Sequence, residues 1–196
     1  ACWPIKKRWS ARLKTMSIVT RRGDRGRTSL MYQRPVSKCH ARIEACGAVD
    51  ELNAALGLAR AAARKAPLRR KLAALQQSLV ALMGELATLP QDLPRYVKGQ
   101  YPLLTPGQTA ELEQWIRQIE ATPVAPRGWA MPGANTAAAT LDLARTVCRR
   151  AERRVCALRE ARQLTNPEIV IYLNRLSDLL WLLARQAEAK PPPRRS

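Results

Sequence analysis

The chain has little of several residue types on which common catalytic and metal sites depend. It contains one histidine, His40, and none of its five cysteines is spaced C-x-x-C. A zinc or iron–sulfur centre of the usual kinds is therefore not expected. A Ser-His-Asp triad or a histidine general base would have to use His40. Because the cysteines show no pairing pattern, we expect reduced thiols.

Long apolar runs are also missing. The longest is Leu179–Ala184, far short of the ~18 residues that a membrane-spanning helix needs. No apolar segment follows the basic residues near the start of the chain, so no signal peptide is predicted. We expect a cytoplasmic protein with no membrane partner. Its 196 residues, 46% of them apolar, suit one domain with a real core.

Positive charge, by contrast, is in excess. The net charge is +19, and it is still +11 without the five basic residues of 1–15 and the three of 190–196. Such an excess favours an anionic partner, although a solvated arginine-rich surface would give the same charge. We predict a basic disordered extension over 1–15, one domain over 16–189, and a disordered Pro/Arg-rich tail over 190–196.

Helical periodicity dominates the domain. Apolar spacing predicts helices at about 41–64, 68–88, 105–121, 136–162 and 166–189. Thr105-Pro106 and Asn166-Pro167 are typical helix starts, with a capping side chain followed by proline. Strand signals are almost absent: residues 17–40 are predicted as an irregular loop with one short strand at 17–20. The fold class predicted is all-α, a five-helix bundle.

An arginine stripe marks the fourth predicted helix. Arg145, Arg149 and Arg153 are spaced i, i+4, i+8 and lie on one face. Like charges at this spacing cost the helix a few tenths of a kcal/mol per pair, which an anion would offset. Guanidinium groups match phosphate oxygens, and Glu152 could orient Arg149. The alternative is a charged outer face, which is how we interpret Arg150, Arg154 and Arg159 by spacing alone.

Two other helices carry polar groups between apolar positions. Asn174 and Asp178 share one face of the last helix. If these side chains are buried, they need hydrogen-bond partners. They either hold the helices of the bundle in register or line a binding site. On the first helix, Asp50 could pair with an arginine of the fourth. The pattern alone leaves both questions open.

The loop Thr20–Ser29 reads TRRGDRGRTS and combines glycines, arginines and hydroxyl groups. Glycines let backbone N–H groups approach a phosphate, and the side chains add donors. The loop is not a Walker A motif, because G-x-x-x-x-G-K-[ST] is absent. Alone, it is a weak indication of anion binding.

Taken together, four blocks resemble the PduO-type ATP:cob(I)alamin adenosyltransferases. They are the loop Thr20–Ser29 followed by Val36-Ser37-Lys38; Arg42–Asn53 (RIEACGAVDELN); Pro132-Gly133 followed by Ala144–Arg153 (ARTVCRRAER); and Tyr172–Asp178 (YLNRLSD). The blocks keep the family's order and span about residues 16–187. The resemblance implies that residues 16–189 form a cobalamin adenosyltransferase domain.

The resemblance also implies a site. It implies a homotrimer with ATP bound between subunits, magnesium carried with ATP, and assistance by K⁺. The implied ATP-binding residues are Thr20, Arg21, Arg22, Gly23, Thr28, Ser29, Lys38, Arg149, Arg150, Glu152, Arg153 and Asn174. The implied cobalamin-binding residues are Trp129, Asp50, Arg145 and Asp178, with Asp50 and Arg145 bridging two subunits. Arg149, Arg145 and Asp178 would be catalytic. A corrinoid reductase or an adenosylcobalamin-dependent enzyme would be the partner.

One departure from the family concerns aromatic residues. The family usually has phenylalanine where this chain has Trp129, and often where it has Trp181; the chain contains no phenylalanine. Two alternative functions remain at this stage. One is a catalytically weak relative that binds ATP or adenosylcobalamin as a chaperone or sensor. The other is a basic helical nucleic-acid-binding protein, whose binding would depend steeply on salt.

Overall fold

The computed structural model describes Val19, Arg21, residues 23–121 and residues 130–188. The segments expected to be disordered at both ends lie outside these residues, as do most of the strand expected at 17–20 and the candidate site residues Thr20, Arg22 and Trp129.

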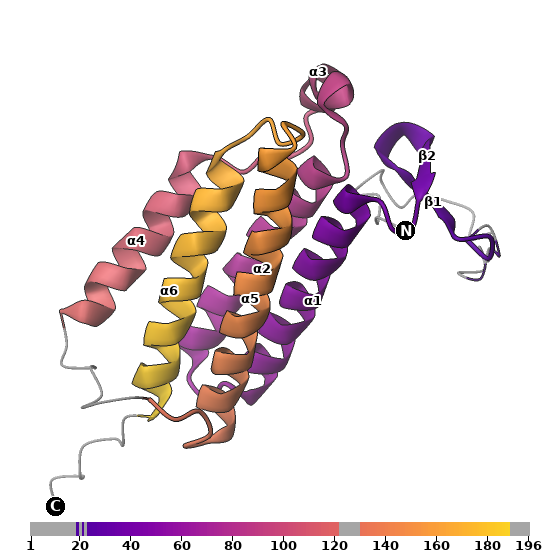
Figure 1. The fold of residues 1–196 in the computed structure, drawn as a ribbon. Coiled ribbons are helices and arrows are strands. Elements are labelled where there is room, and N and C mark those ends of the chain that lie inside the picture. The colour runs from indigo at the N-terminus through magenta and orange to yellow at the C-terminus, as the bar shows by residue number, and fades with distance from the viewer. Residues whose placement is uncertain (1–18, 20, 22, 122–129, 189–196) are drawn as a thin grey trace, which may run out of the picture.

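Five long helices lie side by side and form the body of the protein (Figure 1). They are α1 (Ala41–Ala62), α2 (Ala66–Leu86), α4 (Pro106–Glu120), α5 (Thr136–Glu160) and α6 (Glu168–Glu188). Helix α5 packs against α1 and α6, while α2 packs on α1 and α4 on α6. The expected all-α architecture is therefore confirmed, with helix bounds within a few residues of those predicted.

Two elements depart from the expectation. The connection predicted over 89–104 contains a 3-10 turn, η2 (Pro90–Asp92), and the short helix α3 (Leu93–Lys98), so the described part holds six α-helices instead of five. The predicted irregular loop contains an antiparallel hairpin of β1 (Arg27–Leu30) and β2 (Arg34–Ser37), joined by the 3-10 turn η1 (Met31–Gln33). Four-residue strands without clear alternation give little sequence signal.

Helix starts follow the side chains that cap them. Thr105 and Gln108 form a capping box at the start of α4, and Asn166 Oδ1 accepts a hydrogen bond from Glu168 N at 3.0 Å before α6. His40 caps α1, where its Nδ1 accepts a hydrogen bond from Arg42 N at 3.2 Å. Since the first N–H groups of a helix have no partner within it, these side chains supply the missing acceptors.

The core is built mainly of leucine and alanine from all five long helices. Helix α6 contributes most heavily, with Tyr172 fully buried among the leucines. Within the described residues no single helix has the length and apolar character to cross a membrane; by length and composition only Ala66–Leu86 and Pro90–Lys98 taken together would meet that test, with a bend of 104°.

The hairpin is fastened to the end of the bundle where α2 finishes. Met31 N donates to Ala87 O at 2.9 Å. Arg34 binds the Asp92 carboxylate through two nitrogens, at 2.8 and 2.7 Å, and the Arg95 guanidinium lies 4.2 Å from the centroid of the Tyr32 ring. The loop that precedes the hairpin is thereby held at this end of the bundle.

Glu85 is a buried carboxyl between α2 and two connections. Its Oε2 accepts a hydrogen bond from Leu104 N at 3.2 Å. Burial raises its pKa above the ordinary value of 4.5, although hydrogen bonds from Asn166 and Leu104 oppose the rise. A carboxyl whose folded pKa is raised favours the folded state fully below its ordinary pKa and loses that contribution as the pH rises through the folded value.

We therefore expect Glu85→Gln to become more stable relative to the natural chain as the pH rises. The amide stays neutral, so it avoids the cost of a buried carboxylate. Thermal melting of both proteins between pH 4 and pH 8 measures the difference. Glu111→Gln, an exposed carboxyl on α4, is the control. A difference in melting temperature that does not change with pH would contradict the raised pKa of Glu85.

Candidate functional site

The arginine stripe of α5 has one anchored end and one open end. Arg149 and Arg153 are exposed, and within the part of the chain that the structure describes neither forms an ion pair. Arg145 is half-buried, and its Nε lies 3.4 Å from Asp142 Oδ1. The predicted alignment on one face is confirmed, because α5 continues unbroken through all three positions. About 12 Å of helix separates Arg145 from Arg153.

Polar side chains of three helices connect beside this stripe. Asn174 Nδ2 donates to Glu152 Oε1 at 3.2 Å and so joins α6 to α5. Arg175 donates to Asn174 Oδ1 at 3.1 Å and to Glu113 Oε1 of α4 at the same distance. The expected pairing of Glu152 with Arg149 is replaced by this contact with Asn174. Asn174 therefore helps to hold the helices in register.

Cys148 lies beneath these residues. Its thiol donates to Leu173 O at 3.3 Å. Burial raises the pKa of this thiol far above its ordinary value, and the nearby Glu152 and Asp178 carboxylates add to the effect while Arg149 opposes it. The thiol is neutral at physiological pH, which leaves no thiolate nucleophile here.

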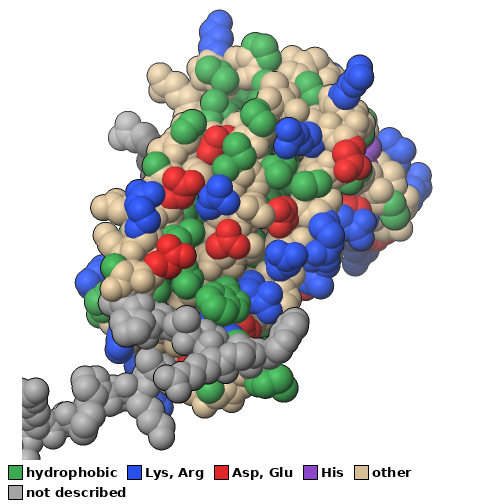
Figure 2. Space-filling view, turned by 60° about the vertical axis from the view of Figure 1, so that its left-hand side comes forward, with side chains coloured by type: hydrophobic (Ala, Val, Ile, Leu, Met, Phe, Trp, Pro, Cys, Tyr) green, Lys and Arg blue, Asp and Glu red, His purple; other side chains and the backbone are tan. Residues whose placement is uncertain are grey.

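An open groove of about 600 Å³ runs between α4 and α6. Its lining consists of Glu113, Ile116, Arg117 and Glu120 from α4 and Arg175, Asp178, Trp181 and Leu182 from α6. Figure 2, which brings the α4 side forward, shows acidic, basic and apolar side chains intermixed over this face. Asp178, predicted as a site residue, is exposed there. The α4 residues were missed by sequence reasoning, because they follow the ordinary pattern of an amphipathic helix.

The basic loop brings several predicted residues together at the hairpin. Thr28 is half-buried and Ser29 exposed in β1, and Lys38 N donates to Gly26 O at 2.9 Å. A side chain at Gly23 would place its Cβ 2.9 Å from Lys38 Nζ, so glycine allows the ammonium group to approach the loop. Gly26 has a φ of +70°, a conformation that favours glycine. Arg21 is exposed.

The acidic residues of α1 behave differently from one another. Asp50 is exposed and, within the described residues, forms no ion pair, whereas its neighbour Glu51 pairs with Arg150 of α5. Within one chain, then, Asp50 does not pair with an arginine of α5. Arg150 lies on the outer face, as its spacing predicted, but it is held by α1. The bridge between Asp50 and Arg145 of different subunits stays a prediction.

The hairpin that follows the basic loop and Arg145 of the stripe lie toward opposite ends of the bundle within one chain. The hairpin is fastened where α2 ends, and Arg42 beside it contacts Gln163 just beyond the end of α5. Arg145 lies near the other end of α5, about 22 Å from its last residue. No hydrogen bond or ion pair of the described residues joins the loop to the stripe.

The fold and these residues define a helical bundle that exposes a stripe of basic side chains, and comparison with known proteins assigns it to a family. The chain matches the cobalamin adenosyltransferase family over residues 18–187. It is 39% identical over 178 residues to the corrinoid adenosyltransferase PduO of Salmonella typhimurium, covering 89% of this chain and 50% of that protein. It is 38% identical over 175 residues to a corrinoid adenosyltransferase of Citrobacter freundii, covering 89% and 96% respectively.

The chain therefore belongs to the cobalamin adenosyltransferase family, as the four sequence blocks predicted. It spans about half the length of the PduO relatives it matches. A solved structure of a variant PduO-type ATP:corrinoid adenosyltransferase from Lactobacillus reuteri, complexed with cobalamin and ATP, matches with a TM-score of 0.79 and 30% identity. That match covers 88% of this chain and 93% of the other.

Asp92 offers a test of how the loop is held. The hydrogen bonds from Arg34 lower the pKa of Asp92 below its ordinary 3.8. A carboxyl of this kind stabilises the fold above its ordinary pKa and loses that contribution as the pH falls through the lowered value. We expect Asp92→Asn to melt at a lower temperature than the natural chain at pH 7, with a smaller difference near pH 3.

Proteolysis of the hairpin should report the same contact. Asp92→Asn and Arg34→Gln should each speed cleavage near residues 23–37. Because the two side chains bind each other, the double variant should be little worse than either single variant. Strictly additive losses would show that the two residues act independently.

Proposed function

We propose that the protein transfers the adenosyl group of ATP to the cobalt of a reduced corrinoid. The observation that carries the proposal is the contact between the third and fourth family blocks: Glu152 of α5 accepts a hydrogen bond from Asn174 of α6, and Arg149 and Asp178 both lie near Cys148. Arg149 and Arg153 of the third block are exposed without an ion pair among the described residues, which leaves them available to a polyphosphate.

ATP is the expected anion. The loop residues Arg21, Thr28, Ser29 and Lys38 supply donors on one side, and the α5 stripe supplies guanidinium groups on the other. In this proposal Thr20 and Arg22 complete the loop. Charge-assisted bonds to phosphate oxygens are about twice as strong as neutral ones. They would stabilise the triphosphate as it leaves.

Magnesium is proposed to arrive as MgATP. Among the described residues no group of three His, Cys, Asp or Glu side chains could hold a metal ion. The phosphate oxygens would supply the ligands. Assistance by K⁺ stays a prediction.

The corrinoid is proposed to lie at the α4–α6 groove, toward the end of the bundle where α4 finishes. Asp178 and Trp181 line the groove, and the proposal places Arg145, Asp50 and Trp129 around the same substrate. A cob(I)alamin cobalt is itself the nucleophile. Its electron pair forms the cobalt–carbon bond at C5′ while the C5′–O bond breaks, and triphosphate departs with that bonding pair.

Such a reaction requires no basic side chain, because no proton is removed from the nucleophile. This agrees with the position of the single histidine, His40, which caps α1. The tasks of the chain are to align C5′ with cobalt and to bind the leaving group. Removing water from the reacting centre would strengthen these interactions.

A second copy of the chain is proposed to complete the site. The hairpin that carries the loop is fastened where α2 ends, and Arg145 lies in the first half of α5. A partner would bring a loop to the stripe and Asp50 to Arg145. A homotrimer with ATP between subunits satisfies this requirement. A corrinoid reductase or an adenosylcobalamin-dependent enzyme would supply or receive the corrinoid.

An anaerobic assay tests the function. Protein, chemically reduced cob(I)alamin and MgATP should give adenosylcobalamin and triphosphate in equal amounts. The loss of the cob(I)alamin absorbance measures the rate of this reaction. Binding of ATP or adenosylcobalamin without turnover would instead support the chaperone or sensor interpretation. Tight, steeply salt-dependent DNA or RNA binding without corrinoid binding would support the nucleic-acid interpretation.

Arg149→Ala should lower kcat by about 10²-fold or more, because one donor to the departing triphosphate is lost. The melting temperature and the oligomer size should be unchanged, since Arg149 is exposed and unpaired among the described residues. Arg154→Ala, an exposed arginine one turn from Arg150 on the outer face, is the matched control. Natural activity in Arg149→Ala would remove that residue from the site.

Gly23→Ala tests the loop. The added Cβ would displace the Lys38 ammonium, which lies at the end of a flexible side chain, so folding should be unaffected. We expect the KM for MgATP to rise several-fold while the corrinoid KM stays the same. Gly107→Ala at the start of α4, where the nearest contact is 3.4 Å away, is the control. An unchanged KM for MgATP would show that Lys38 does not contribute to nucleotide binding.

A further inference from the structure

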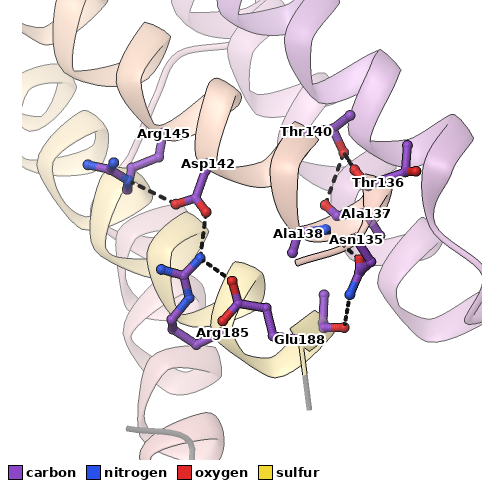
Figure 3. A network of polar contacts seen from close by, with 10 residues as sticks. Asn135, Thr136, Ala137, Ala138, Thr140, Asp142, Arg145, Arg185 and Glu188 are labelled. Carbon is purple, nitrogen blue, oxygen red and sulfur yellow. Dashed lines mark hydrogen bonds and ion pairs between the residues drawn. The ribbon is translucent and has the colours of Figure 1, made fainter. Parts of the chain in front are cut away.

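A buried ionic network lies between the first half of α5 and the end of α6 (Figure 3). Asp142 of α5 accepts a hydrogen bond from Arg185 Nη2 of α6 and lies 3.4 Å from Arg145 Nε. The same Arg185 nitrogen donates to Glu188 Oε1 at 2.8 Å. The side chains of Asp142 and Arg185 are only 4% and 2% exposed. Two cations and two anions therefore balance around a central pair that is buried from water.

The network reaches both regions assigned to the corrinoid. The Arg185 guanidinium lies 5.7 Å from the centroid of the Trp181 ring, which lines the α4–α6 groove. Through Asp142 the same arginine is connected to Arg145. The buried Arg185 side chain thus contacts a groove residue on its own helix and the carboxylate that binds Arg145.

The geometry around Arg145 is directional. Asp142 accepts from Nε, and within the described residues no hydrogen bond or ion pair uses the two terminal nitrogens of Arg145. Its side chain is 27% exposed. A guanidinium held at Nε cannot rotate freely, so the edge of the group formed by the two terminal nitrogens faces away from Asp142. Asp142 is itself fixed by Arg185, because separating this buried pair would leave an uncompensated charge.

We propose that Asp142 and Arg185 are positioning residues for the corrinoid half of the reaction. Their pair holds Arg145 with its terminal nitrogens presented outward and fixes one face of Trp181. This inference rests on the proposed function for the role of Arg145. Neither Asp142 nor Arg185 touches the substrate in this arrangement, and each acts through a neighbour.

The test separates positioning from folding. Asp142→Asn keeps the shape and an acceptor oxygen but loses the charge that orders both arginines. We expect the KM for cob(I)alamin to rise about tenfold or more while the KM for MgATP changes less than twofold. A purely structural role would lower the melting temperature and leave both KM values of the folded protein unchanged, which would overturn the proposal.

A double variant tests whether the effect passes through Arg145. If it does, Asp142→Asn combined with Arg145→Ala should have a kcat/KM no lower than Arg145→Ala alone. Multiplied losses would overturn that connection. Glu188→Gln is the matched control: it removes the charge of a partner of Arg185 that does not contact Arg145, so both KM values should stay within twofold of the natural chain.

Two further measurements cover the remaining outcomes. Arg185→Lys, which keeps the charge but loses the planar fork, replaces Asp142→Asn if that variant does not fold, and the same rise in corrinoid KM is expected. If the natural chain binds cob(II)alamin and ATP without turnover, the proposed function fails. In that case a tenfold weaker cob(II)alamin affinity in Asp142→Asn or Arg185→Lys still supports the positioning role. Activity in the natural chain with unchanged kinetics in both variants overturns the inference alone. A natural chain that neither reacts nor binds corrinoid overturns both.

Discussion

The arrangement of the bundle at the end where α2 and α5 finish depends on the hydrogen bonds of the buried Arg42 side chain. It donates to Leu86 O at 2.9 Å and Thr88 O at 3.0 Å, and to Gln163 O beyond α5. Carbonyl groups at the C-terminal end of a helix have no partner within it and carry partial negative charge. One guanidinium therefore satisfies acceptors of two helix ends from the first turn of a third. The hairpin docks beside this point through Ala87, so the basic loop takes its position from the same contact.

Arginine serves three physical roles in this chain, and net charge alone does not distinguish them. Arg42 and Arg185 are buried and hold helices together. Arg150 is exposed but pairs with a carboxylate of α1. Arg149 and Arg153 are exposed on α5 with no ion pair in the described part of the chain. The anion-binding argument rests on the last two, because a buried guanidinium that already donates to protein acceptors has little left to offer a ligand.

Local patterns account for what the sequence predicted well. Thr105-Pro106 and Asn166-Pro167 mark helix starts through capping, which involves only neighbouring residues. The alignment of the arginine stripe follows from helical periodicity alone. The hairpin was missed because its stability comes from docking onto Ala87 and Asp92, far along the chain. The same reason hid Asp142 and Arg185: they are 43 residues apart, and no periodicity relates a carboxylate on one helix to a cation on another.

The contrast between the two ends of the stripe fits the two substrates that the proposed reaction needs. A triphosphate changes its charge distribution as it leaves, so its arginines are best left with all donors available, as Arg149 and Arg153 are among the described residues. A corrinoid is large and must present cobalt along one line of approach to C5′, so a rigid contact is useful near it. Arg145 is held at Nε by a buried carboxylate, and such a contact costs no reorganisation when the substrate binds. Because one helix carries both kinds of arginine, the distance between the anion and the corrinoid contact is set by the helix itself, independently of how the loop of a second copy closes over them.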